Sequence, residues 1–196
     1  MRQPVPLPQA YRLLNHGPTV LVSAAHGGQR NLMAAAWAMP LDFDPPKVAV
    51  VVDRSTFTRG LIEASGSFAL QVPCAAQADL VTTVGNTSGR PLAEAGTDKF
   101  VVHGIGCFDA KLIDAPLVDG CVAWLECRVI AWPDLQRAHD LFLAEVVAAQ
   151  ADDRVFSAGR WHFDRADAAL RTLHHTSGGA YLLPGEAVLG RVIDPK

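Results

Sequence analysis

Residues 54–58, with the sequence RSTFT, combine side chains that could hold a phosphate group. They bring the guanidinium of Arg54 and the hydroxyl groups of Ser55, Thr56 and Thr58 to the start of an expected helix that follows a strand. Free main-chain N–H groups and the positive end of the helix dipole favour an anion at such a place. Capping of the helix by one hydroxyl group would use the same residues, so the pattern alone leaves both interpretations open.

A second polar cluster follows in residues 86–91, which read NTSGRP. Ser88, Gly89 and Arg90 lie together in this stretch, and Lys99 supplies a further positive charge. Basic side chains beside hydroxyl groups suit a phosphate, because charge-assisted hydrogen bonds are the strong ones. An ordinary surface turn is the alternative interpretation of the same residues.

Residues 33–37 are conspicuous for the size of their side chains, because Ala34, Ala35 and Ala36 stand in a row between Met33 and Trp37. Three alanines favour a helix on propensity, but the prolines that follow would stop a helix, and the valine-rich stretch after them favours a strand. A planar ring could lie against the main chain of such a strand, whose N–H and C=O groups would then contact the ring's edge. Close packing of a helix would also need small residues, and Trp37 is either a wall of the site or part of the core.

The composition describes a chain of 196 residues that is 49% hydrophobic and 19% charged, with a net charge of −3. This length and hydrophobic content suffice for one domain with a sizeable core. A low charged fraction is consistent with a surface that a partner subunit partly covers. The charge balance offers no footprint for nucleic acid, and no basic run suggests a membrane surface.

The cysteines Cys74, Cys107, Cys121 and Cys127 form no Cys-x-x-Cys pair, so we expect neither a disulfide framework nor a zinc site. The N-terminal residues contain prolines where a signal peptide needs an apolar core. The longest apolar runs, about five residues, fall far short of the roughly 20 that span a bilayer. We therefore expect a cytoplasmic protein.

The elements that must position these residues follow from the hydrophobic pattern. Strands are predicted over residues 19–25, 32–39, 47–53, 67–73, 122–132 and 140–150. Helices are predicted over residues 54–66, with Ser55 or Thr56 as the cap and Gly66 at the end, and over residues 75–84. The glycines in residues 26–31 predict a hairpin between the first two strands.

This order of elements predicts the fold class. Strands outnumber helices and the two do not alternate regularly, which favours a mainly β (α+β) fold, a β-barrel with a few inserted helices, over a doubly wound sheet. No linker or repeat divides the chain, so residues 1–196 are expected to form one domain. A phosphate loop and a nucleophile elbow are absent from the sequence, and no spacing supports a metal site at His174 and His175.

The residues from Asn31 to Phe100 resemble the signature region of the flavin-reductase-like, FMN-binding split-barrel proteins. This family includes flavoredoxin and the reductase components of two-component monooxygenases. The resemblance covers about residues 20–149, with a looser echo at residues 178–181. The matching features, in order, are Asn31, Met33, Trp37, Asp44-Pro45-Pro46, Thr58, Leu61-Ile62, Val72-Pro73, Ser88-Gly89-Arg90 and Asp98-Lys99-Phe100.

The resemblance implies a Greek-key-type split β-barrel and a bound FMN. The flavin ring would lie against the stretch from Met33 through Ala34, Ala35 and Ala36 to Trp37. The phosphate end would be held by Arg54, Ser55, Thr56, Thr58, Ser88, Gly89, Arg90 and Lys99. The family often has hydroxyl groups where this chain has Ala34 and Ala36, so ring recognition would come from the main chain.

The resemblance also implies a homodimer and a reaction in which NADH or NADPH delivers hydride to flavin N5, so the cofactor carries the chemistry. Hydride transfer needs no side-chain acid or base, so no catalytic residue is assigned. His139, His174 and His175 are candidates for contacting the substrate or the flavin, and ordinary surface histidines are the alternative. A monooxygenase or another electron acceptor would be the partner.

Two other functions stay open at this point. One is an FMN-containing electron-transfer protein, similar to flavoredoxin, that oxidises NAD(P)H poorly. The other is FMN-dependent oxygen chemistry on a small organic substrate. The sequence does not choose between NADH and NADPH, and it does not identify the acceptor.

Overall fold

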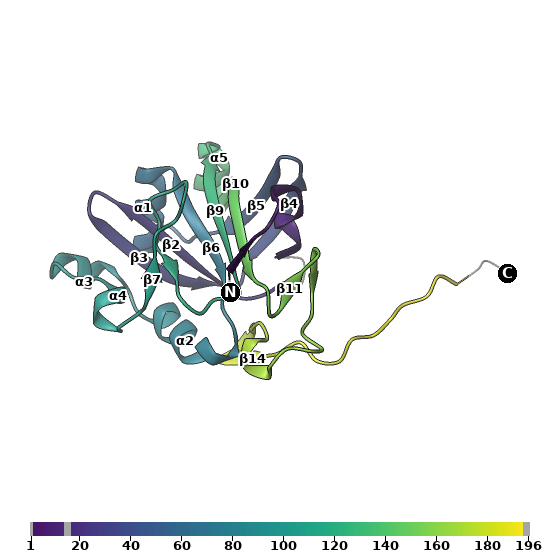
Figure 1. Ribbon diagram of the computed structural model, residues 1–196. Helices are drawn as coiled ribbons and strands as arrows, with labels where there is room; N and C mark the ends of the chain where they lie inside the picture. Colours follow the sequence, from purple (N-terminus) through teal and green to yellow (C-terminus); the bar gives the residue numbers. More distant parts are fainter. Residues whose placement is uncertain (1, 14–16, 194–196) are drawn as a thin grey trace.

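One antiparallel sheet dominates the computed structural model, which describes residues 2–13 and 17–193 (Figure 1). Within these ranges the sheet has eight strands in the order β3-β2-β6-β9-β10-β5-β4, and β1 also pairs with β10. The strands are β1 (Arg2–Pro4), β2 (Val20–His26), β3 (Gln29–Ala35), β4 (Ala38–Phe43), β5 (Pro46–Val51), β6 (Ser67–Val72), β9 (Ala123–Ile130) and β10 (Leu141–Asp152). The predicted mainly β fold is confirmed.

The remaining elements are short. The helices are η1 (Leu7–Leu13), α1 (Phe57–Ser65), η2 (Ala75–Gln77), α2 (Ala78–Asn86), α3 (Arg90–Glu94), α4 (Lys99–Val102), α5 (Pro133–His139) and η3 (Ala168–Leu170). Three small hairpins complete the fold: β7 (Cys107–Phe108) with β8 (Leu117–Val118), β11 (Phe156–Ser157) with β12 (Arg160–Trp161), and β13 (His174–Ser177) with β14 (Ala180–Leu182). None of the helices in the described ranges is long and apolar enough to cross a membrane.

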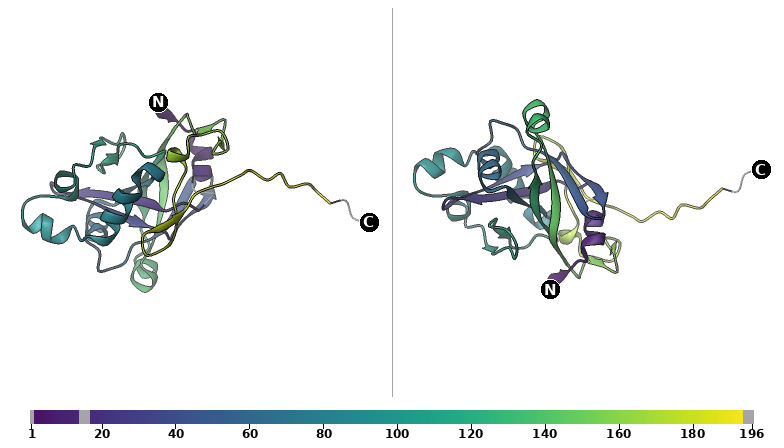
Figure 2. Two further views of the ribbon diagram at one scale, coloured as in Figure 1. Left: turned by 90° about the horizontal axis from the view of Figure 1, so that it is seen from below. Right: turned by 90° about the horizontal axis from the view of Figure 1, so that it is seen from above.

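Strand β3 separates two hydrophobic clusters, and this determines where its small residues point. Met33 and Ala35 pack against a large cluster that includes Val22, Leu70 and Phe142. Leu32 belongs to a second cluster, which Ala34 borders and which includes Val81 and Val84 of α2. Alternate residues of a strand point to opposite faces, so Ala34 faces α2 while Ala35 faces the larger core. Figure 2 shows the blue and teal helices α1 to α4 near the β2–β3 end of the sheet, whereas the green helix α5 stands apart from them.

The hairpin predicted in residues 26–31 is confirmed by the β2–β3 pairing, with Gly27 and Gly28 at positive φ in the turn. The single strand predicted over residues 32–39 is wrong. Strand β3 ends at Ala35 and pairs with β2, whereas β4 begins at Ala38 and pairs with β5 at the other end of the sheet order. The chain must cross between these partners, so residues 36–37 cannot stay in either ladder.

The helix predicted after β5 is confirmed as α1. The Thr56 side chain accepts a hydrogen bond from Arg59 N, and Gly66 ends the helix at a φ of 69°. An uncapped end would leave the first N–H groups without partners, and a non-glycine residue would be strained in the left-handed region. Both ends of α1 are therefore fixed by residues that the sequence identifies.

Arg59 ties α1 to distant parts of the chain. Its guanidinium donates hydrogen bonds to Asp140, to Glu63 and to the carbonyl of Gln136 in α5. The Arg59 side chain is only 8% exposed and that of Asp140 16%. A charged pair this deeply buried needs both partners, because removal of one leaves the other desolvated and unpaired.

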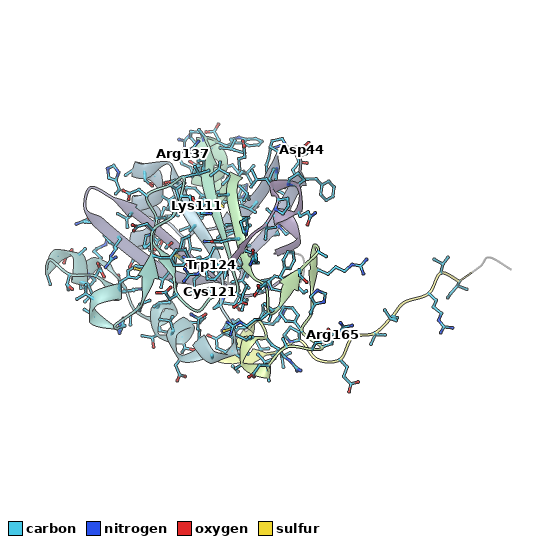
Figure 3. All side chains as sticks on the ribbon, viewed as in Figure 1. Asp44, Lys111, Cys121, Trp124, Arg137 and Arg165 are labelled. Carbon is cyan, nitrogen blue, oxygen red and sulfur yellow. The ribbon has the colours of Figure 1, made fainter. Side chains whose placement is uncertain are left out.

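We expect the replacement Arg59→Met to lower the free energy of unfolding by about 3 kcal/mol, because Asp140 then loses its main buried partner. Arg137→Met is the matched control, since Arg137 and Asp134 form an exposed pair at the end of the molecule where α5 lies (Figure 3). That change should cost no more than about 0.5 kcal/mol. Urea denaturation of both variants measures the difference, and equal losses would contradict the assigned role of Arg59.

Candidate functional site

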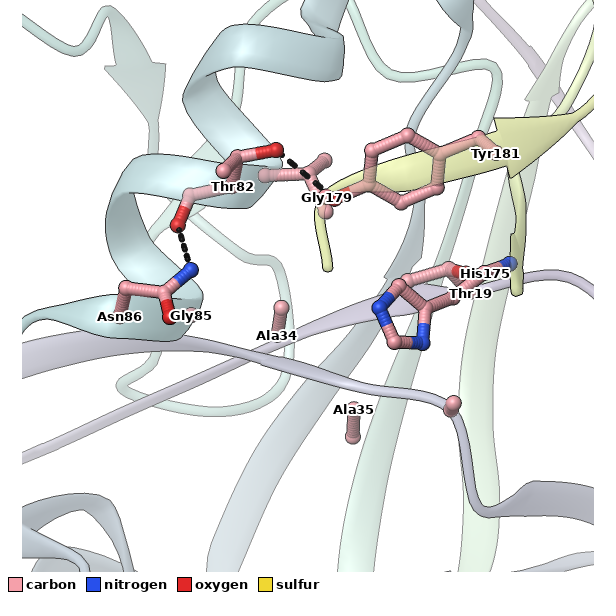
Figure 4. Close-up of a pocket in the computed structure, with 11 residues that line it drawn as sticks. Thr19, Ala34, Ala35, Thr82, Gly85, Asn86, His175, Gly179 and Tyr181 are labelled. Atoms are coloured by element: carbon pink, nitrogen blue, oxygen red, sulfur yellow. Dashed lines mark hydrogen bonds between the residues drawn. The ribbon is translucent and has the colours of Figure 1, made fainter. Parts of the chain in front are cut away.

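Two adjoining cavities lie along β3 and meet at Ala34, Gly85 and Asn86. The first, here called the alanine cavity, has a volume of about 290 Å³ and lies between β3, α2 and the β13–β14 hairpin (Figure 4). The second, the hydroxyl cavity, has a volume of about 260 Å³ and lies between the start of α1 and the end of α2. Together they form one elongated site with a different lining at each end.

Ala34, Ala35 and Ala36 line the alanine cavity on β3 and just after it, and His175 and Tyr181 line it from the hairpin. Figure 4 shows the side chains of Ala34 and Ala35 pointing to opposite sides of the strand. The Tyr181 hydroxyl lies 3.0 Å from the Thr82 hydroxyl of α2. The hairpin is also bound to the residue before β2, because His175 N donates to Thr19 Oγ1 at 3.0 Å. These contacts hold the hairpin beside the alanines and leave a shallow, mainly small-residue space between them.

The main chain of β3 points into this space. The Leu32 carbonyl accepts a hydrogen bond from Lys99 Nζ at 2.8 Å, so it points away from β2. In an antiparallel ladder the outward and inward groups alternate along the strand. The N–H and C=O groups of Ala34 therefore share the orientation of Leu32 and point off the free edge of the sheet, where a ligand can meet them.

Helix α2 approaches β3 unusually closely at this point. A Cβ atom on Gly85 would lie 3.2 Å from Ala34 Cβ, so a larger residue at either position would push the helix away. Lys99 also holds α2 close to β3. Its ammonium donates to the carbonyl of Leu32 in β3 and to that of Val84 in α2, each at 2.8 Å. The Lys99 side chain is buried, and burial lowers its pKa to about 8.

The hydroxyl cavity contains a buried polar atom without a partner in the described chain. Asn31 is 3% exposed, and its Nδ2 donates to Thr58 Oγ1 at 2.8 Å, but its Oδ1 accepts no hydrogen bond. Gly89 borders this atom so closely that a Cβ there would lie 2.1 Å from it. A buried carbonyl oxygen without a donor is costly, so the site suits a ligand that donates a hydrogen bond here.

The start of α1 supplies the remaining polar groups of the hydroxyl cavity. Phe57 and Thr58 occupy its first turn, where main-chain N–H groups have no partner within the helix. Ser55, Thr56, Thr58 and Ser88 also line this cavity. The hydroxyl groups of Ser55 and Thr56 donate to the carboxylate and the carbonyl of Asp53, at 2.6 and 2.8 Å. The N–H groups at the start of a helix favour an anion.

Most residues predicted for the site come together there. The residues that line one cavity or both are Met33, Ala34, Ala35, Ala36, Ser55, Thr56, Thr58, Ser88, Gly89 and Lys99. Met33 lines the hydroxyl cavity rather than the alanine cavity. Lys99 lies behind the hydroxyl cavity with its ammonium bound to two carbonyls, which was not expected from its sequence position.

Three predicted residues lie outside both cavities. Arg54 donates to the Arg137 carbonyl at 3.0 Å and pairs with Asp140, so its guanidinium points toward α5. Trp37 is 75% exposed, so it is not a core residue, and it lines neither cavity. Arg90 lies at the rim, 5.7 Å from the centre of the Phe57 ring.

Four further residues line the site but were not assigned to it from the sequence, namely Asn31, Thr82, Asn86 and Tyr181. Asn31 belongs to the family signature, Asn86 opens the polar stretch of residues 86–91, and Tyr181 ends the looser match at residues 178–181, whereas Thr82 carried no signal. Of the histidines, His175 lines the alanine cavity, whereas His139 lies in α5 and His174 lines neither cavity. Among the described residues no group of three potential metal-ligating side chains gathers.

Comparison with known proteins identifies the family. Residues 12–171 match the family described as "Flavin reductase like domain", and the chain belongs to this family. YddH from Escherichia coli is 45% identical over 188 residues, which are 94% of this chain and 96% of YddH. The predicted family resemblance is confirmed.

Solved structures agree with this family. An FMN-binding domain of a flavin reductases-like enzyme from Shewanella baltica is 48% identical, with a TM-score of 0.92, over 97% of this chain and 98% of that one. Flavoredoxin of Desulfovibrio vulgaris is 25% identical, with a TM-score of 0.73, over 89% of this chain and 90% of that one. The predicted flavin-reductase-like fold is confirmed by these likenesses.

The contact between Gly89 and Asn31 can be tested by stability. Gly89→Ala should lower the free energy of unfolding by about 1–3 kcal/mol, because the new methyl group must displace Asn31 and break its bond to Thr58. Gly60→Ala is the matched control in α1, where a Cβ meets nothing within 4 Å. That change should stabilise the protein by up to about 1 kcal/mol. Thermal and urea denaturation measure both, and a neutral Gly89→Ala variant would refute the close packing described.

Proposed function

We propose that this protein is an FMN-binding oxidoreductase that takes hydride from NADH or NADPH. The observation that carries the proposal is the pairing of the two cavities at Ala34. One cavity offers a flat, small-residue floor beside a free main-chain edge, and the other offers a helix start with hydroxyl groups. FMN has the same division, with a planar ring at one end and a phosphate at the other.

The alanine cavity suits the ring. Ala34 and Ala36 leave room for a planar group close to the main chain, and the outward N–H and C=O groups of Ala34 can pair with the polar edge of a flavin. Gly85 extends the same surface on α2. Larger side chains at these positions would fill the space that the ring needs.

The hydroxyl cavity suits the ribityl and phosphate groups. A ribityl hydroxyl can donate to Asn31 Oδ1, which has no donor among the described residues. The N–H groups at the start of α1 and the hydroxyl groups of Thr58 and Ser88 can bind the phosphate. Lys99 adds a positive charge behind them without an acidic partner within hydrogen-bonding distance in the part of the chain described.

FMN, when bound, accepts a hydride from a reduced nicotinamide and passes electrons to an acceptor. The chain's part is to bind, orient and exclude water. Tyr181 and His175 cover the alanine cavity from the hairpin, and their rings pack edge to face at 5.6 Å. They leave the cavity's opening as the place where a nicotinamide or another flat substrate would enter.

Two similar proteins of known structure are described as binding FMN, which supports the proposal. The Shewanella protein is described as an FMN-binding domain of a flavin reductases-like enzyme, and a protein from Thermus thermophilus, 25% identical with a TM-score of 0.70, as an FMN-binding protein. We extend FMN binding to this chain because its own cavities suit the cofactor.

The proposal includes a homodimer. Strand β4 and the residue before it expose Trp37, Met39, Leu41 and Phe43, at 46–75% each. Trp37 and Met39 are two positions apart and share a face of the strand. The pairing of β4 with β5 is irregular between Pro40 and Asp42, so Phe43 lies on the opposite face. Exposed apolar patches of this kind mark interaction sites, and the low charged fraction of the chain is consistent with one.

Titration of the apoprotein tests the function directly. FMN should bind at least about tenfold more tightly than riboflavin, because only FMN carries the phosphate that the hydroxyl cavity binds. NADH or NADPH added without oxygen should then bleach the flavin absorbance. Equal affinity for FMN and riboflavin would refute the proposal that the hydroxyl cavity binds the phosphate. Bleaching by dithionite alone would identify an electron carrier instead of a reductase.

Lys99 makes FMN binding depend on pH. Its pKa of about 8 means that the ammonium is charged below that pH and neutral above it. The charge attracts the phosphate, so affinity should be full below pH 8 and fall about tenfold above it. Riboflavin is the control ligand, because it has no phosphate. The same pH dependence in folded Lys99→Met would show that another group titrates.

A further inference from the structure

The β13–β14 hairpin covers one side of the alanine cavity but is not part of the main sheet. Within the described ranges its two strands pair only with each other, and the pairing is irregular after His175. Its turn contains Gly178 and Gly179, at φ of 56° and 82°. A hairpin of two strands is marginally stable by itself. Its position over the cavity therefore depends on its contacts with the rest of the chain.

Two hydrogen bonds attach the hairpin, one on each strand. On β13, His175 N donates to Thr19 Oγ1 at 3.0 Å, and Thr19 is itself buried. On β14, the Tyr181 hydroxyl lies 3.0 Å from the Thr82 hydroxyl, and Figure 4 shows the Tyr181 ring reaching across to α2. Leu182, the next residue of β14, is 66% exposed and adds little packing. The Thr82–Tyr181 pair is therefore the main polar attachment of β14.

Thr82 is the fixed member of this pair. It lies in α2, which is held against β3 by the bond from Lys99 to the Val84 carbonyl and by the close approach of Gly85 to Ala34. The turn of the hairpin packs on the same threonine, because a Cβ atom on Gly179 would lie 3.5 Å from Thr82 Cγ2. Thr82 thus contacts the hairpin at its turn and at its second strand.

The pair is also a polar group of the alanine cavity, since both residues line it. Two hydroxyl groups carry two hydrogens, and the bond between them uses one. The second O–H can donate to a ligand in the cavity. The bond forms only when β14 lies beside α2, so a ligand that contacts the hairpin in this position stabilises it there.

We propose that Thr82 is a positioning residue that holds Tyr181, and with it β14, over the ring end of the FMN site. This inference rests on the proposed function and adds how the site retains its ligand. A ring in the alanine cavity lies between β3 and the hairpin, because the cavity does. When the pair breaks, β14 can move away from α2 while β13 stays bound at Thr19, and the ring is uncovered. The Thr82–Tyr181 pair therefore sets how fast FMN leaves.

The release rate of FMN from the full-length protein tests this role. The FMN-loaded protein is diluted rapidly, and the fluorescence of free FMN is followed. Thr82→Val keeps the shape of the side chain without its hydroxyl, so release should be about three- to tenfold faster, the effect of one hydrogen bond. Tyr181→Phe removes the other hydroxyl and should give the same increase. The double variant should be no faster than either, because the same bond is lost.

Two controls separate this role from a general effect on α2. Thr82→Ser keeps the hydroxyl and should release FMN within twofold of the wild-type rate. Thr83→Val makes the same change one residue further along α2, at a position that lines neither cavity, and should also stay within twofold. Hydrogen exchange of the FMN-loaded Thr82→Val variant should show faster exchange in residues 180–182, whereas the amide of His175 should keep its protection.

The outcomes distinguish this inference from the proposed function. Release at the wild-type rate from Thr82→Val would refute the role of Thr82 and leave FMN binding intact. Equal acceleration in Thr83→Val would overturn it as well, because α2 as a whole would then be responsible. A wild-type protein that binds no FMN would refute the proposed function and this inference together. Thermal denaturation checks that each variant folds, and Tyr181→Phe decides by the same criterion if Thr82→Val does not.

Discussion

The close approach of α2 to the free edge of β3 is the constraint on which the site depends. Gly85 and Ala34 permit it, and the Lys99 ammonium fixes it by bonding to one carbonyl on each element. Without this approach, the two cavities would not share a boundary. Because α2 lies beside it, the unpaired edge of β3 becomes one side of a cavity into which its main-chain groups point. Helix α2 also keeps other strands from pairing with this edge.

The same arrangement explains why small residues dominate the ring end of the site and hydroxyl groups the other. Alanines bring a ligand close to the main chain, so hydrogen bonding passes from side chains to N–H and C=O groups. At the start of α1 the main chain already presents N–H groups, and Asn31 is positioned from β3 by its bond to Thr58. The two ends of the proposed FMN site therefore use the main chain in two different ways.

The sequence predicted those parts of the structure that local signals determine. The β2–β3 hairpin follows from Gly27 and Gly28, and α1 follows from Thr56 and Gly66, because turn and cap chemistry acts within a few residues. The family resemblance then brought most of the site residues together. The break after Ala35 escaped prediction, because it reflects which distant strand each half pairs with.

Long side chains were the least predictable part of the site. Arg54 lies beside the hydroxyl cavity in sequence, but Asp140, brought close by the end of α5, draws its guanidinium away. Lys99 reads as a surface charge, but the fold buries it against two carbonyls. Tyr181 and Thr82 are in contact because the β13–β14 hairpin returns to α2. Residues this far apart in the sequence leave no local pattern from which the contact could be predicted.

The central claim is that the outward main chain of β3 at Ala34 holds the flavin ring. Amide chemical shifts of the labelled protein during FMN titration test it most directly. The account predicts that the Ala34 amide shows one of the largest shifts and gains protection from hydrogen exchange, with smaller changes near Arg59 and α5. An unchanged Ala34 amide in a protein saturated with FMN would contradict the account and place the ring elsewhere.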